Sequence, residues 1–349
     1  MEVTVDPSRN FVITTIDPVG SWSWEAKVAS PESDLIVRCV RQVLDVWATL
    51  RSLGMVEARA EADVTVHDAD NRAVLLRKER VPAGAPHAGA ESALLDACST
   101  LSGQHVGCVT IDLSLPGASY RGGVPHAVRQ LFVVSLDMWP SGVTTTTLHT
   151  FSDAWLSHDL RGHRQPDVQQ ENAPRLKAAL AAITELIGSP VQPWDPGAHG
   201  VPTEDGFEDF PDDDPDLLDS WYMFEIPRRT ERLQEKIPQD APRYESETST
   251  PVEFVDVSLD EEVIGYLWAA ESGDAAGYEP RTPAGHVAMD AAADWLAYLS
   301  QAKGRGLSSL DALREAMHGE GTKRSGAVAS GSLRRASSAE EVQELSGRE

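Results

Sequence analysis

The chain has 349 residues, with 30 Lys and Arg against 55 Asp and Glu, so its formal net charge is −25 at pH 7. This length is too great for one small core and suits two domains. The charge repels nucleic-acid phosphates and anionic lipids, which argues against a nucleic-acid or membrane partner and favours a basic protein partner.

The sequence carries no recognisable export signal or membrane-spanning run. The first six residues carry acid where a signal peptide carries base, and no apolar stretch approaches the roughly 18 residues that span a bilayer. Cys39, Cys98 and Cys108 are odd in number and lie among apolar neighbours, which is typical of buried free thiols. We expect a cytoplasmic protein, and the Ala, Arg, Asp and Gly usage suggests a bacterial source.

The chain opens with two strand-like runs at residues 10–16 and 22–28, separated by a turn cluster, which predict a hairpin. A helix should follow, with Pro31 at its start and Gly54 at its end. Its apolar residues share one helical face: Ile36, Val40, Val43, Trp47 and Leu50.

Further strands are predicted by apolar, β-branched or alternating runs at residues 58–67, 72–80, 106–115, 130–138 and 143–150. A helix over residues 171–187, ended by Gly188, should pack on this sheet. Because the strands come mostly in hairpins, residues 1–190 are expected to form an α+β domain with a mixed or mainly antiparallel sheet.

The composition changes after this domain. Residues 191–250 are acidic and rich in proline, which predicts a linker or mobile loop that buries little apolar surface. Residues 251–320 combine one strand-like run with helical patterns, so we expect a small, mostly helical domain. Residues 321–349 are rich in Ser, Gly, Arg and Glu, and they are expected to form a disordered tail.

Two groups of residues are candidate sites. The first holds possible ligands for zinc or iron, although the spacing fits no standard motif and a polar surface loop is the alternative. This group consists of His149, His158, Asp159 and His163. The second is an acidic run next to aromatic residues, a combination found at protein interfaces. It consists of Glu204, Asp205, Glu208, Asp209, Asp212, Asp213, Asp214, Trp221, Tyr222 and Phe224.

The sequence contains neither a recognised nucleophile motif nor a glycine-rich phosphate loop. Our leading hypothesis is therefore a non-catalytic, acidic protein-binding module, such as an immunity or antitoxin-like protein that neutralises a basic partner. The alternative is a metal-dependent hydrolase or oxygenase that uses the group from His149 to His163. Near the C-terminus, Arg334-Arg335-Ala336-Ser337 also matches a phosphorylation sequence of low specificity.

Overall fold

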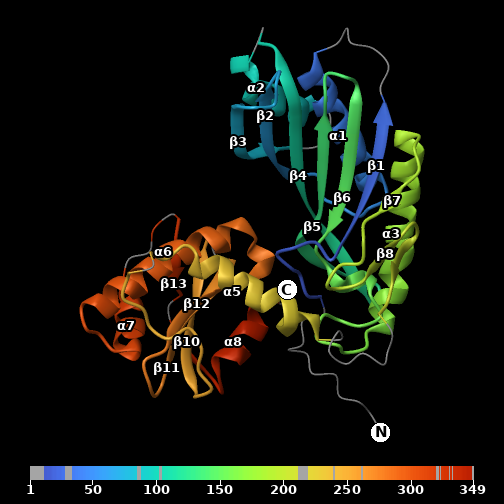
Figure 1. The fold of residues 1–349 in the computed structure, drawn as a ribbon. Coiled ribbons are helices and arrows are strands. Elements are labelled where there is room, and N and C mark those ends of the chain that lie inside the picture. The colour runs from blue at the N-terminus through green and yellow to red at the C-terminus, as the bar shows by residue number, and fades with distance from the viewer. Residues whose placement is uncertain are drawn as a thin grey trace. The chain divides into compact units, whose positions relative to one another are not determined.

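The fold was obtained as a computed structural model (Figure 1). It describes residues 12–27, 34–84, 88–101, 104–210, 219–238, 240–260, 262–319, 322, 324–329, 331 and 333–347. The chain divides into two compact units. The first unit spans residues 17–220, and the second combines residues 221–347 with residues 12–16.

The first unit is built on a seven-stranded sheet with the order β3-β2-β4-β5-β6-β1-β7, in which every neighbouring pair is antiparallel. The strands are β1 (Gly20–Lys27), β2 (Ala60–Asp68), β3 (Val74–Ala83), β4 (Val106–Arg121), β5 (Val124–Met138), β6 (Val143–Thr150) and β7 (Gln192–Pro193). The long β4–β5 hairpin stands at the centre of the sheet (Figure 1).

Helices and a small hairpin complete the first unit. They are α1 (Leu35–Ser52), α2 (Ala88–Ala97), η1 (Ser99–Leu101), η2 (Asp153–Trp155), α3 (Pro166–Ile187), β8 (Val201–Thr203) and β9 (Gly206–Glu208). Helix α1 begins where the Asp34 side chain accepts the N–H of Ile36 at 2.9 Å. Helix α3 ends at Gly188, whose φ of 74° is the left-handed conformation that glycine adopts without strain.

The core of this unit lies on one face of the sheet. Helices α1 and α3 contact β4 and each other, and buried residues such as Ile111 and Leu113 alternate along β4 with half-buried polar ones. Two buried tryptophans of β1 bridge the sheet to later segments. Trp22 Nε1 donates to Thr203 O at 2.7 Å, and Trp24 Nε1 donates to Thr184 Oγ1 at 2.9 Å.

The second unit has a smaller antiparallel sheet, with the order β12-β11-β10-β13 and with β14 also paired to β10. Its strands are β10 (Val252–Leu259), β11 (Glu262–Ala270), β12 (Ala276–Pro280), β13 (Ala327–Val328) and β14 (Arg334–Ala336). Its helical elements are η3 (Trp221–Glu225), α5 (Ile226–Gln234), η4 (Thr282–Ala284), α6 (His286–Gly304), α7 (Ser309–Ala316) and α8 (Ala339–Ser346).

Both faces of this second sheet are covered. On one face, Val255 and Leu267 join a cluster with apolar residues of α6 and α7. On the other face, Phe254 and Trp268 pack against Val342 of α8. The alternation of side chains along β10 and β11 therefore holds a helix pair and the C-terminal helix on opposite sides of one sheet.

The structure confirms the α+β class and the large antiparallel sheet. It also confirms that all three cysteines are free and buried. The predicted opening hairpin is wrong, because β1 pairs with β6 and β7 instead, and residues 10 and 11 lie outside the described residues. The non-local pairing is favoured because it buries both β1 tryptophans, Trp22 against the β8–β9 hairpin and Trp24 against α3.

Three further segments differ from the sequence expectations. Residues 191–250, expected as a linker or loop, contain β7, β8, β9 and α5, while residues 211–218 and 239 lie outside the described part. Residues 251–320, expected as mostly helical, contain three strands. Residues 321–349, expected as a disordered tail, contain β14 and α8, which are held by burial of Ala336, Ala339 and Val342. No helix in the described part of the chain has the length and apolar composition needed to cross a bilayer.

Candidate functional site

A groove of about 1070 Å³ opens on the second unit, between η3 and α5 on one side and the start of α8 on the other. We call it the acidic groove. Its walls include Tyr222, Thr230, Glu245, Glu247, Ser337 and Glu340. Three of its described lining residues are glutamates, and none of them is Lys, Arg or His. The groove therefore presents a negative surface to whatever enters it.

One hydrogen bond joins the two walls of the acidic groove, and a second caps the helix that forms one of them. Tyr222 O–H donates to Glu344 Oε1 at 2.7 Å, which ties η3 to α8. Glu341 N–H donates to Ser338 Oγ at 3.4 Å, so that Ser338 caps α8. The α8 wall is thus held by a cap at its start and by a side-chain bond one turn further on.

The segment that carries Glu245 and Glu247 is held by its backbone. Glu245 N–H donates to Asp274 O at 3.0 Å, and Ala276 N–H donates to Glu245 O at 3.1 Å. Further along, the hydroxyls of Thr248 and Thr250 share a hydrogen bond of 2.9 Å. These bonds attach the segment to the start of β12, so the two glutamates are presented from a fixed backbone.

A buried ion pair supports the α8 wall from inside the unit. Arg229 of α5 lies 2.9 Å from Glu279 of β12, and Arg229 Nη1 donates to Ser346 Oγ of α8 at 2.6 Å. Burial raises the pKa of Glu279, while the Arg229 guanidinium acts to lower it. Gln343, which lines the acidic groove, also reaches Glu279 Oε1 at 3.5 Å. The network joins α5, β12 and α8.

The acidic and aromatic residues predicted as one binding element fall into different units. Glu204, Asp205, Glu208 and Asp209 belong to the first unit, at or beside the β8–β9 hairpin. Asp205 pairs there with Lys177 at 2.7 Å, and Asp209 Oδ1 accepts the N–H of Ser157 at 3.1 Å. Asp212, Asp213 and Asp214 lie outside the described residues.

The aromatic residues of that prediction start the second unit. Trp221 is fully buried and belongs to the interior, with Arg229 5.6 Å from its ring centroid. Tyr222 lines the acidic groove, and Phe224 is half-buried. Among the predicted binding residues that the structure describes, Tyr222 is the one in the groove wall.

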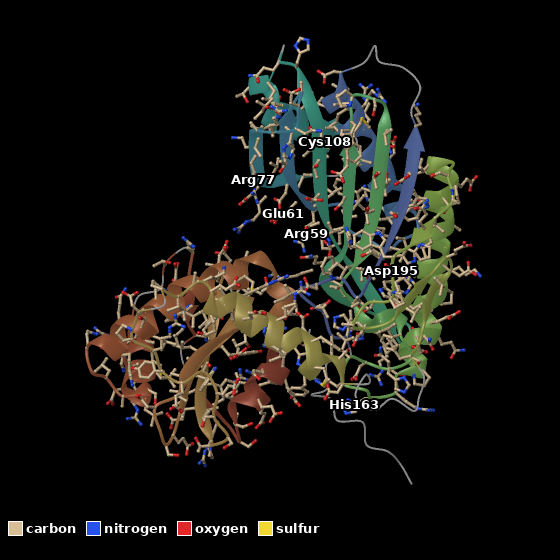
Figure 2. All side chains as sticks on the ribbon, in the orientation of Figure 1. Arg59, Glu61, Arg77, Cys108, His163 and Asp195 are labelled. Atoms are coloured by element: carbon tan, nitrogen blue, oxygen red, sulfur yellow. The ribbon has the colours of Figure 1, made fainter. Side chains whose placement is uncertain are left out.

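The predicted metal ligands lie in two settings. His149 is on β6, where its Nδ1 shares a 2.7 Å hydrogen bond with Ser21 Oγ and its ring meets Trp194 edge-on at 5.5 Å. Burial lowers the pKa of His149 to about 4, so its imidazole is neutral at pH 7. His158, Asp159 and His163 follow η2 in a loop at one end of the first unit. Figure 2 shows His163 there, with Cys108 towards the opposite end of the same unit.

In this loop the side chains are engaged with the loop itself. Asp159 Oδ1 accepts the N–H groups of Arg161 and His163, both at 2.9 Å, and Asp159 Oδ2 lies 3.2 Å from His163 Nδ1. His158 Nδ1 shares a hydrogen bond of 2.8 Å with Ser157 Oγ. Within the residues that the structure describes, no three His, Cys, Asp or Glu side chains are grouped so that they could hold a metal ion.

His199 was not among the site residues predicted from the sequence. It lines a small pocket of about 30 Å³ together with His158, Asp159 and Asp209. Burial lowers the pKa of His199 to about 4, with Asp17 acting in the opposite direction. No spacing signal connects His199 to the loop, because more than thirty residues separate them along the chain.

Acidic residues also meet on the face of the large sheet opposite α1 and α3. Asp63 of β2 is the direct cross-strand partner of Asp112 of β4. Burial raises the pKa of Asp112, a hydrogen bond from Ser135 opposes this, and Asp137 and Asp63 raise it further. In Figure 2, Glu61 of β2 and Arg77 of the adjacent β3 are labelled at the edge of this sheet. This face is polar and carries like charges at close range.

No protein-family model matches the chain, and no curated protein or solved structure matches it. The function is therefore inferred from the geometry of the acidic groove.

Proposed function

We propose that this protein is a non-catalytic binding module whose acidic groove receives a cationic segment of a partner protein. The observation that carries the proposal is the lining of the groove, which includes Glu245, Glu247 and Glu340 and in which no described residue is basic. An immunity or antitoxin-like protein that covers a basic toxin would work in this way.

The size of the groove suits a peptide segment. Its volume of about 1070 Å³ lies just above the roughly 300–1,000 Å³ that is usual for a small-molecule site. The groove is open to solvent, so a peptide segment can enter it. Lysine and arginine side chains can lay their apolar stems along the walls while their charged ends reach the glutamates.

Tyr222 adds a second type of contact. Its ring is half-buried in the groove wall, and its hydroxyl is already fixed by Glu344. An arginine guanidinium stacks favourably on such a ring, and the contact contributes about 0.5–1 kcal/mol at an exposed site. The groove therefore favours arginine over lysine, because only the planar guanidinium both stacks and binds a carboxylate through two N–H groups.

The net charge of the whole chain supports capture of such a partner. A charge of −25 attracts a cationic segment before contact is made and increases the association rate. Salt screens this attraction, with a Debye length of about 8 Å at physiological ionic strength. We expect the association rate to fall steeply as salt is added.

The test is the binding of a fluorescent arginine-rich peptide to the full chain, measured by anisotropy at low and at physiological salt. In the groove variant, Glu245→Gln, Glu247→Gln and Glu340→Gln are combined. The matched control combines Glu204→Gln, Asp205→Asn and Glu208→Gln, which removes the same formal charge from the β8–β9 hairpin.

We expect the groove variant to bind about tenfold more weakly or worse, because three carboxylates of the groove lining are lost. The control should stay within about twofold of the unaltered chain. Equal losses in both variants would mean that net charge alone attracts the peptide, and undetectable binding by the unaltered chain would refute the proposal.

A further inference from the structure

Ser337 lies on the rim of the acidic groove, between β14 and α8. It is exposed, and its N–H and O–H both donate to Glu341 Oε2, at 2.7 and 2.8 Å. The backbone around it is extended, because β14 is a strand and Ser338 has φ −159° and ψ 169°. An enzyme that acts on extended peptides therefore meets this serine in a suitable conformation.

Two arginines precede Ser337 in the extended segment. Arg334 pairs with Asp256 and stacks over the Phe254 ring at 4.5 Å, and Arg335 pairs with Glu271. Their side chains remain 45% and 66% exposed. Exposed ion pairs contribute little free energy, so a competing acidic pocket on another protein can displace them.

The position of β14 at the edge of its sheet further lowers the free energy needed to expose this segment to an enzyme. This strand has three residues and pairs with β10 through residues 334–336. Most of its segment is exposed, with Ala336 as the buried anchor. Short edge pairings of this kind open locally at small free-energy cost.

We propose that Ser337 is a phosphorylation site for a protein kinase that reads the arginine pair, and that its phosphate strengthens the attraction of the acidic groove for a cationic partner. The second claim, that the phosphate strengthens binding of a cationic partner, rests on the proposed function. In the reaction, Ser337 Oγ forms a bond to the γ-phosphorus of a nucleoside triphosphate, and the bridging bond to the β-phosphate breaks. The hydroxyl proton passes to the kinase, and a nucleoside diphosphate leaves.

The surroundings of Ser337 can hold a phosphate. The group would stand at the first turn of α8, where free backbone N–H groups and the helix dipole favour an anion. Phosphorylation would remove the O–H that donates to Glu341, while the Ser337 N–H remains a donor and Ser338 keeps its own capping bond. The rim would gain about −1.5 to −2 charge, beside a lining that already holds Glu340.

Ser338 is the natural comparison, because it is the neighbouring hydroxyl. Its oxygen is half-buried and accepts the Glu341 N–H, so it is engaged as the cap of α8. It also stands one residue further from both arginines. We therefore expect phosphate on Ser337 and not on Ser338.

The first experiment treats the full chain with a serine/threonine kinase that prefers arginine before the serine, together with Mg²⁺ and ATP. Intact and fragment mass spectra should show one phosphate on Ser337, and its rate of addition should fall at least about tenfold in an Arg334→Gln, Arg335→Gln variant. Phosphate on other residues only, or unchanged incorporation in Ser337→Ala, would overturn the site.

The second experiment compares the phosphorylated and the unmodified chain in the arginine-rich peptide assay. Binding should become about threefold to tenfold tighter at low salt, and the difference should shrink as salt is added. Unchanged or weaker binding would overturn the regulatory half. If the unmodified chain binds no peptide, the proposed function fails, while the mass spectra still decide whether Ser337 is modified.

Discussion

Arg229 and Glu279 form an ion pair across the interior of the second unit, with Nη2 and Oε2 2.9 Å apart and side chains only 0% and 9% exposed. Removing both charges from water costs several kcal/mol, which their attraction and additional hydrogen bonds must offset. Here Ser346 and Gln343 supply such bonds, and both residues belong to α8. The pair thereby couples the C-terminal helix to the rest of the unit.

We predict that Arg229→Met destabilises the second unit by about 3–5 kcal/mol, because Glu279 would remain as a buried charge without its counterion. Adding Glu279→Gln should recover part of the loss. Denaturant unfolding followed by tryptophan fluorescence measures both. As a control, Arg324→Met removes a partner from the exposed pair with Asp294 and should cost no more than about 1 kcal/mol. Equal losses in the two single variants would contradict the role of burial.

Two buried histidines of the first unit should make its free energy of unfolding depend on pH. Burial lowers the pKa values of His149 and His199 to about 4, below the ordinary value of 6.5. The folded state therefore favours the neutral imidazoles. Their contribution is fully present above pH 6.5 and is lost as the pH falls from about 6.5 to about 4, by up to about 3 kcal/mol for each histidine.

The measurement is the unfolding free energy of the unaltered chain and of His149→Gln between pH 7 and pH 4. Glutamine can still share a hydrogen bond with Ser21 but does not titrate. The loss of stability on acidification should therefore be shallower in the variant. Parallel curves would show that His149 is not held neutral by the fold.

The paired aspartates on the open sheet face predict a stabilising substitution. Asp63 and Asp112 are direct cross-strand partners, and like charges in such positions are destabilising. Asp112→Asn removes the repulsion while its amide oxygen can still accept the Ser135 hydroxyl bond. We expect a gain of about 0.2–1 kcal/mol at pH 7 that disappears at acidic pH, where the raised pKa of Asp112 leaves this group protonated. A loss of stability at pH 7 would show that the repulsion from Asp63 does not outweigh the favourable contacts of the Asp112 carboxylate.

Local patterns predicted the first unit well because its elements carry their own signals. The helix expected to end at Gly54 is α1, Leu35–Ser52, and the five strand-like runs between residues 58 and 150 correspond to β2–β6. Apolar periodicity and turn residues act over a few positions, so they are visible in the sequence. The partner of β1 was not predictable in this way, because β6 lies more than a hundred residues further along the chain.

The candidate sites depended on contacts that spacing does not reveal. His149 and His163 are close in sequence, yet one lies on a strand and the other in the loop after η2. Glu247 and Glu340 are far apart in sequence, yet both line the acidic groove because α8 packs on the second sheet. The tail that carries α8 has the polar composition of a disordered segment. A few buried apolar side chains, among them Ala339 and Val342, are what hold it in place.

The packing of the second sheet can be tested at Gly265 of β11. A Cβ atom at Gly265 would lie 2.2 Å from the Tyr278 hydroxyl oxygen and 2.8 Å from the backbone oxygen of Glu279. Since the backbone of β12 cannot move without breaking its pairing with β11, we expect Gly265→Ala to destabilise the unit by about 1–3 kcal/mol.

The matched substitution is Gly304→Ala, whose Cβ would meet Pro242 at an ordinary 3.6 Å near the end of α6. It should be neutral or slightly stabilising, because alanine favours helix. Thermal unfolding of both variants decides the matter: a Gly265→Ala chain as stable as the unaltered one would mean that β11 and β12 do not pack as described.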